Sequence, residues 1–141
     1  MGNARELFEG FGKAITGDRA ELERVCDRDI DFSDTMQKVR GIDGVQQYLT
    51  TWSTGFPDAR VEITSVIESG DRAAAELLYT GTHTGPMASP QGEVPATGKS
   101  VKLPGTAWID IKNGKIAAFR GYYDGLAMMA QLGLMPAPAT A

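Results

Sequence analysis

The chain has 141 residues and a formal net charge of −4 at pH 7, with 42% hydrophobic and 23% charged residues. This length predicts one soluble domain with enough apolar material for a core. The acidic balance, without basic stretches interleaved with aromatic residues, excludes a typical nucleic-acid binder, and an anionic membrane surface would repel it. We expect neither nucleic acid nor membrane as a partner.

Cysteine and histidine each occur once, as Cys26 and His83. A single cysteine forms no intrachain disulfide, which fits a cytoplasmic setting. One Cys and one His cannot supply the four ligands of a structural zinc site. The first six residues lack a hydrophobic signal core. We therefore expect a cytoplasmic protein without a metal site.

The first part of the chain has helical periodicity. Apolar residues spaced by three and four predict a helix over residues 4–16, a short helix after Asp18 and a third helix over 42–53. Residues 29–34 have the pattern of a short extended segment between the second and third helices.

From Pro57 onwards, apolar residues alternate with polar ones, which is typical of half-buried strands. This pattern predicts strands over 61–68, 73–82, 100–112 and 115–124, with a Gly- and Pro-rich loop over 85–98. Asn113 and Gly114 form the strongest hairpin signal, because both residues accept positive φ. A last helix over 125–132 precedes a tail, 136–141, that we expect to be disordered.

Helices come first and antiparallel strands second, so the order predicts an α+β fold in one domain over residues 1–135. Without a bulge, the last hairpin places Arg120, Tyr122 and Asp124 on one face, beyond an aliphatic stretch. This pattern indicates a pocket with a polar end, or a hairpin that simply emerges into solvent. A bulge would reverse the assignment beyond it.

The opposite face of this hairpin carries Trp108, Phe119 and Tyr123. No remaining helix is obviously available to cover these aromatic side chains. An exposed apolar patch of that size usually marks an interface. We therefore expect a homodimer formed through this outer face of the sheet.

Several short stretches, taken in order, resemble the SnoaL-like polyketide cyclase family of the nuclear transport factor 2-like superfamily. They are Phe56-Pro57-Asp58, Gly81-Thr82-His83-Thr84-Gly85, Pro95-Ala96-Thr97-Gly98-Lys99, Asn113-Gly114-Lys115-Ile116, Tyr123-Asp124 and Gln131-Leu132-Gly133. The resemblance implies a conical barrel, in which a curved antiparallel sheet has the N-terminal helices on its concave face. It also implies a cofactor-independent cyclase or isomerase that acts on a carbonyl-rich, polyketide-like small molecule. The loop over 86–94 departs from the family pattern, which leaves the substrate open.

By this resemblance, Asp124 is the catalytic acid/base, since the family places an Asp at the end of the last long strand. A carboxyl group in an apolar cavity has a raised pKa and can take up and return a proton near neutral pH. The alternative is that Asp124 caps the helix beginning at Gly125. His83 would polarise a carbonyl or hold Asp124, or else be a structural histidine. Arg120 would stabilise an enolate oxygen, or merely pair with Asp124.

The predicted substrate-binding residues are aromatic. Tyr122 would donate a hydrogen bond to an enolate oxygen, whereas the others would form pocket walls or simply pack in the core. These others are Tyr79, Trp52, Phe8, Phe11 and Tyr48.

Two other functions remain open at this point. An epoxide hydrolase of the Asp-Arg-Asp type would use Arg120 and Asp124, with Asp31 or Asp34 as its third member. A non-catalytic domain would only bind a small molecule. A catalyst requires its carboxyl group to be buried with a perturbed pKa, and a binding domain does not.

Overall fold

The computed structural model describes residues 3–89 and 92–135, and the predicted tail at 136–141 lies outside them. The helices are α1 (Ala4–Ile15), α2 (Ala20–Val25), α3 (Gly41–Gly55) and α4 (Gly125–Gln131). The strands are β1 (Cys26–Ser33), β2 (Lys38–Arg40), β3 (Arg60–Ser69), β4 (Arg72–Thr82), β5 (Met87–Ser89), β6 (Gly92–Val94), β7 (Ser100–Lys112) and β8 (Lys115–Tyr123).

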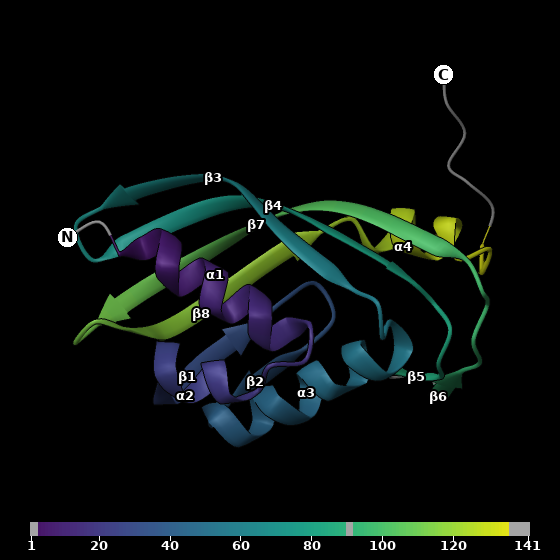
Figure 1. Ribbon diagram of the computed structural model, residues 1–141, viewed down its shortest axis with the longest axis horizontal. Helices are drawn as coiled ribbons and strands as arrows, with labels where there is room; N and C mark the ends of the chain where they lie inside the picture. Colours follow the sequence, from purple (N-terminus) through teal and green to yellow (C-terminus); the bar gives the residue numbers. More distant parts are fainter. Residues whose placement is uncertain (1–2, 90–91, 136–141) are drawn as a thin grey trace.

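The main sheet has the strand order β2-β1-β8-β7-β4-β3 and is curved (Figure 1). Its described neighbours pair antiparallel, except that β1 runs parallel to β8. Helices α1 and α3 lie on the inner side of the curve (Figure 1). The predicted α+β class and the helices on the concave face are confirmed.

The predicted helices and long strands are present, with bounds that differ by a few residues. Three short strands were not predicted. The short strand β2 pairs with β1, and the region predicted as a loop over 85–98 contains the β5–β6 pair. Their three-residue length is too short for alternation to be recognised in the sequence.

The core has two clusters of buried side chains. In the first, Phe11 of α1 stacks on Phe119 of β8 with ring centroids 4.2 Å apart, and Phe32 lies 5.3 Å from Phe119. The second cluster gathers around Trp52 and Phe56 near the C-terminal end of α3. Such stacked rings add to the stabilisation that burial of their apolar area provides.

A bulge in β8 reverses the predicted faces of the last hairpin. Ile111 pairs with Ile116, but Asp110 pairs with Ala118, which leaves Ala117 without a partner in the register. Because side chains along a strand alternate with a period of two, one extra residue exchanges the faces of everything beyond it.

The bulge places Phe119 and Tyr123 on the inner face, so their predicted place on the outer face is wrong. Arg120 and Tyr122 lie on the outer face with Trp108, so the prediction that they point inwards is wrong as well. Paired residues share a face, and Trp108 pairs with Arg120.

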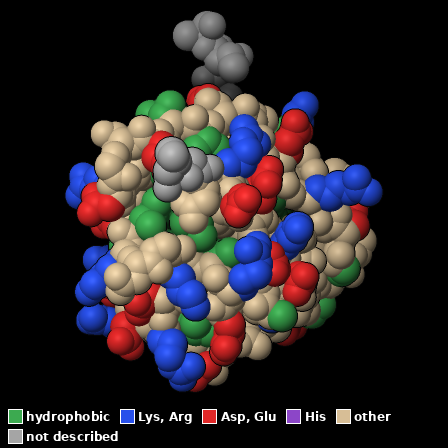
Figure 2. Space-filling view, turned by 60° about the vertical axis from the view of Figure 1, so that its left-hand side comes forward, with side chains coloured by type: hydrophobic (Ala, Val, Ile, Leu, Met, Phe, Trp, Pro, Cys, Tyr) green, Lys and Arg blue, Asp and Glu red, His purple; other side chains and the backbone are tan. Residues whose placement is uncertain are grey.

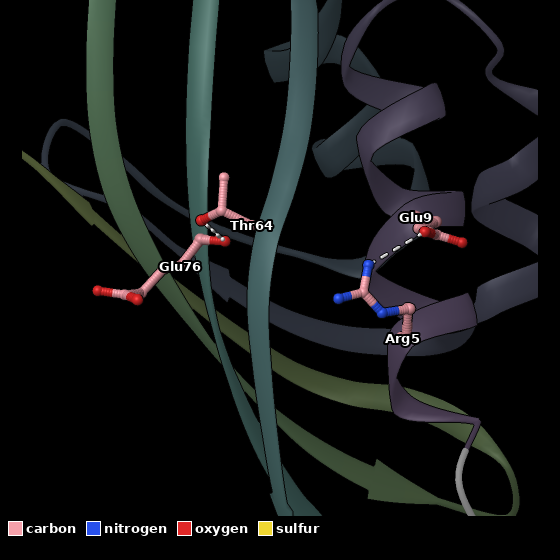
Figure 3. A network of polar contacts seen from close by, with 4 residues as sticks. All are labelled: Arg5, Glu9, Thr64 and Glu76. Carbon is pink, nitrogen blue, oxygen red and sulfur yellow. Dashed lines mark hydrogen bonds and ion pairs between the residues drawn. The ribbon is translucent and has the colours of Figure 1, made fainter.

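A second bulge, in β3, acts in the same way. Ile63 pairs with Leu77 and Ser65 with Glu76, so Thr64 is the extra residue. Its Oγ1 donates a 3.1 Å hydrogen bond to the Glu76 carbonyl oxygen, which Figure 3 shows beside α1. Ile67, beyond the bulge, is 67% exposed on the outer face, whereas unbroken alternation from Ile63 would place it on the inner face.

The surface mixes charges of both signs. In Figure 2, basic and acidic side chains lie next to one another over the face in view. Examples are the ion pair between Arg5 and Glu9 at 3.4 Å, seen in Figure 3, and that between Arg24 and Glu21 at 2.7 Å. Within residues 3–89 and 92–135, no helix has the length and apolar character needed to cross a membrane.

Candidate functional site

A cavity of about 90 Å³ lies where the two core clusters meet, between α3 and the inner face of the sheet. Most of its lining is apolar or aromatic. The lining residues that matter below are Asp34, Tyr48, Trp52, Tyr79, Gly105 and Tyr123.

Asp34 is the one charged residue that the described part of the chain contributes to this lining. It directly follows β1, and its side chain closes a tight turn. Oδ1 accepts hydrogen bonds from the backbone N–H groups of Met36 and Gln37, at 2.8 and 3.0 Å. An aspartate that accepts from residues two and three positions ahead is a standard way to start a turn.

The turn after Asp34 is held against the end of β8. Thr35 Oγ1 donates to the Tyr123 carbonyl oxygen at 2.9 Å and accepts from the Tyr123 backbone N–H at 3.1 Å. On the same strand, a Cβ added at Gly121 would come 3.7 Å from Asp34 Cβ and 3.2 Å from Phe119 Cε1. The parallel pairing of β1 with β8 therefore brings Asp34 to the cavity, and the lack of a side chain at Gly121 leaves room for the neighbouring Phe119 ring.

The remaining carboxylate oxygen of Asp34, Oδ2, accepts a 2.7 Å hydrogen bond from the Tyr48 hydroxyl group. Burial raises the pKa of Asp34, against the opposing effect of the hydrogen bonds from Tyr48, Met36 and Gln37. A carboxyl group with a raised pKa, in an apolar cavity, is suited to exchange a proton with a bound molecule.

Two further tyrosines, Tyr79 of β4 and Tyr123 of β8, pack edge-on against Trp52, with ring centroids 5.3 and 5.8 Å from it. Both hydroxyl oxygens are buried, and neither forms a hydrogen bond of normal geometry with a described residue, although the Tyr48 hydroxyl group is near enough to that of Tyr123 to lower its pKa. Burial raises the pKa of both phenols above the usual range, so both groups keep their proton.

Asp124, the predicted acid/base, is not part of this lining. Its side chain is exposed and accepts a 3.0 Å hydrogen bond from the Ala127 backbone N–H, which makes it the N-cap of α4. The structure therefore shows the capping role that the sequence left as the alternative.

His83 is fully buried but lies outside the cavity lining. Its Nδ1 accepts from the Thr97 backbone N–H at 3.2 Å and lies 3.1 Å from Thr97 Oγ1, and its ring stacks on Phe56 with centroids 5.2 Å apart. Burial lowers the pKa of His83, which favours the neutral ring. The buried, backbone-bonded arrangement is the structural alternative stated above for this residue.

Arg120 lies on the outer face of the sheet, where its Nη1 is 3.4 Å from Asp110 Oδ2. Arg72 approaches the other oxygen of Asp110 at 3.3 Å. Arg120 therefore pairs with Asp110, and no ion pair joins it to Asp124 in the described part of the chain. The Asp-Arg-Asp set of an epoxide hydrolase is not brought together around the cavity.

The predicted aromatic residues divide into two groups. Tyr48, Trp52 and Tyr79 line the cavity. Tyr122 borders it from a strand position whose side chain is 53% exposed. Phe8 and Phe11 are buried in the first core cluster, away from the cavity lining.

Sequence reasoning missed two residues of the site, Asp34 as a principal group and Tyr123 as an inward-facing one. An aspartate at the end of an extended segment is a turn signal, and this signal would have located the turn after β1. Nothing local predicts that Tyr48, on a helix, reaches this carboxyl group. Within the described ranges, no group of three or more His, Cys, Asp or Glu residues is placed to hold a metal ion.

Comparison of the sequence with known families identifies the family of this chain. The sequence profile of the SnoaL-like polyketide cyclases matches residues 9–132, so the chain belongs to the SnoaL-like polyketide cyclase family. No curated protein matches the sequence.

Solved structures share the fold over nearly the whole chain. TsrD from Streptomyces laurentii is 23% identical, with a TM-score of 0.82 over 94% of this chain and 96% of its own. A candidate SnoaL-like polyketide cyclase from Jannaschia sp. CCS1 is 26% identical, with a TM-score of 0.78 over 94% and 89%. IdmH from Streptomyces antibioticus, a candidate polyketide cyclase, is 22% identical, with a TM-score of 0.76 over 92% and 97%.

Proposed function

We propose that this protein is a cofactor-independent cyclase or isomerase that moves a proton at a carbon next to a carbonyl group of a polyketide-like molecule. The observation that carries the proposal is Asp34: a carboxyl group with a raised pKa, lining an apolar cavity, with one oxygen bonded to Tyr48. Membership of the SnoaL-like family supports the same class of reaction.

In the cyclisation, the Asp34 carboxylate takes a proton from the carbon beside a carbonyl, and an enolate forms. The enolate carbon then attacks a second carbonyl carbon of the same molecule, which makes the new C–C bond and an alkoxide. The carboxylic acid returns its proton to that alkoxide. Asp34 thus ends the reaction as the carboxylate with which it began. In an isomerisation, the proton returns to a carbon atom and not to an alkoxide.

Tyr48 has a positioning role in this scheme. Its hydroxyl group donates to Asp34 Oδ2 and holds the carboxyl plane in one orientation. Burial and the neighbouring Asp34 raise the pKa of Tyr48, so it remains a donor throughout. The hydrogen bond also limits how far burial raises the pKa of Asp34.

The proposal is tested by exchange of the α-protons of 2-tetralone in D₂O, followed by NMR. Wild type should accelerate the exchange, and Asp34→Asn should lose about a hundredfold or more of it, the usual size of an acid/base contribution. Asn keeps the shape and can still accept from Met36 and Gln37, so the variant should fold.

Asp124→Asn is the matched control, because it also changes one carboxyl group at a strand end. It should retain exchange within about twofold of wild type, as expected for a residue that only caps a helix. Full activity of Asp34→Asn, with loss in Asp124→Asn, would return the reaction to Asp124 as the family resemblance implies. A wild type that binds 2-tetralone without accelerating exchange would favour the non-catalytic binding domain.

A further inference from the structure

The hydroxyl groups of Tyr79 and Tyr123 are buried, and neither forms a hydrogen bond of normal geometry with a residue in the described part of the chain, although the Tyr48 hydroxyl group lies near enough to that of Tyr123 to lower its pKa. An unpaired buried hydroxyl group destabilises the fold, so such a group persists where something else can pair with it. Both residues line the cavity, and both rings are fixed by the edge of Trp52. Two hydroxyl donors without a well-formed partner thus belong to residues of the cavity wall.

The sheet register sets the spacing of these two tyrosines. Leu77, Gly105 and Tyr123 pair across β4, β7 and β8, and Tyr79 lies two residues beyond Leu77 on the same face. The middle position, Gly105, has no side chain and leaves the inner face open between the two rings. A Cβ there would come 2.8 Å from the Tyr122 carbonyl oxygen and 3.5 Å from Tyr123 Cβ.

The two hydroxyl groups differ in their relation to the carboxyl group. Burial raises the pKa of Tyr123, the negative charge of Asp34 and the neighbouring Tyr79 raise it further, and a hydrogen bond with Tyr48 opposes the rise. For Tyr79, burial comes first and the charge that contributes to its raised pKa is that of Asp58. Tyr123 thus belongs to the Asp34 end of the cavity. Tyr79 belongs to the other end, where it packs against Phe56 with ring centroids 5.9 Å apart.

We infer that Tyr123 and Tyr79 bind two separate oxygen atoms of one ligand, so the site takes a flat apolar molecule with two acceptor oxygens, such as a 1,3-diketone. Resting on the proposed function, the inference assigns to Tyr123 the carbonyl oxygen beside the carbon that Asp34 deprotonates. Tyr79 takes the second carbonyl oxygen. A neutral phenol donor suits an oxygen that gains negative charge as the proton leaves.

The test measures binding alone, so it does not depend on catalysis. Four probes share one carbon skeleton: butylbenzene with no oxygen, butyrophenone and 4-phenyl-2-butanone with one carbonyl each, and 1-phenyl-1,3-butanedione with both. Dissociation constants are measured by calorimetry for wild type, Tyr79→Phe and Tyr123→Phe. Melting temperatures check that each variant folds.

Wild type should bind the diketone most tightly and butylbenzene least tightly. Each Tyr→Phe variant should weaken the diketone by about fivefold, the value of one neutral hydrogen bond, and leave butylbenzene unchanged. One of the two variants should bind butyrophenone more weakly than wild type does, and the other variant should bind 4-phenyl-2-butanone more weakly.

If the variants lose as much affinity for butylbenzene as for the diketone, the tyrosines act through the shape of the cavity and not through hydrogen bonds, which would overturn the inference. Unchanged diketone affinity in both variants, or a wild type that does not prefer the diketone to butylbenzene, would overturn it as well. If both variants bind the same monoketone more weakly and bind the other as wild type does, both tyrosines contact one oxygen atom, and the inference of two separate oxygen sites is wrong. Because 2-tetralone exchange reports on Asp34 independently, the inference and the proposed function can fail separately.

Discussion

The two faces of the last hairpin, β7 and β8, have opposite character. The inner face carries Ile109, Phe119 and Tyr123, which pack on the helices and form one wall of the cavity. The outer face carries Trp108 and Arg120, both partly open to solvent. The same strands thus serve the core and the site on one side, and solvent or another subunit on the other.

This contrast shows how much depends on a single residue. Phe119 and Arg120 are neighbours in the sequence, and Ala117 alone decides which of them turns inwards. A change on the inner face should disturb packing or the ligand site, whereas one on the outer face should leave both intact. Each of the four measurements below can contradict a part of this division.

The largest expected effect is on stability, from Phe119→Ala compared with Arg120→Ala. Removing the buried ring, which stacks on Phe11 at 4.2 Å, should cost about 3–5 kcal/mol of the free energy of unfolding. Removing Arg120 breaks one partly exposed ion pair with Asp110, which should cost less than about 1 kcal/mol. Urea unfolding of both variants measures the difference, and equal costs would contradict the assignment of faces.

The second effect concerns assembly. Ile67, Trp108 and Tyr122 are 67%, 41% and 53% exposed on the outer face, so the predicted homodimer would use these side chains in place of Phe119 and Tyr123. Trp108→Glu should raise the dimer dissociation constant at least about tenfold, because a charge would replace a central aromatic group. Light scattering at micromolar concentration measures it, with Trp108→Phe as the control. A monomeric wild type would contradict the homodimer.

The third effect is at the end of β8, where Asp124 caps α4. Asp124→Ala should lower the free energy of unfolding by about 1 kcal/mol, whereas Asn, which also caps well, should change it by only a few tenths. Thermal unfolding of the two variants shows whether Asp124 stabilises the protein as a helix cap, which Asn can replace, or through its negative charge, which Asn cannot. A large loss of stability in Asp124→Asn would show that its charge matters to the fold.

The smallest effect is a trend with pH that reports on Asp34. Its pKa is raised above the ordinary 3.8 in the folded state, so the folded protein holds this proton more tightly than the unfolded chain does. The stability that Asp34 contributes is therefore present at low pH and is lost as pH rises through the raised value. The stability of wild type relative to Asp34→Asn should fall over that range. Urea unfolding across a pH series measures it, and a constant or rising difference would mean that the carboxyl group is not penalised by burial.

Local patterns predicted the α+β order, the helices and the hairpin at Asn113-Gly114, because periodicity and turn chemistry depend on neighbours in the sequence. The same patterns identified Tyr48, Trp52 and Tyr79, three of the cavity residues, since a helical stripe and an alternating strand both reveal an inward face. The inward face of β4 could be predicted for the same reason.

Only the tertiary structure decided the site itself. A bulge such as that at Ala117 arises from pairing with another strand, so alternation along β8 could not reveal which of Phe119 and Arg120 faces inwards. Asp34 acquires its raised pKa from burial between segments that are distant in the sequence, with Tyr48 of α3 on one side and Gly121 of β8 on the other. Strand ends at Asp34 and Asp124 look alike as sequence; desolvation distinguishes them, and desolvation depends on what the whole fold places around each carboxyl group.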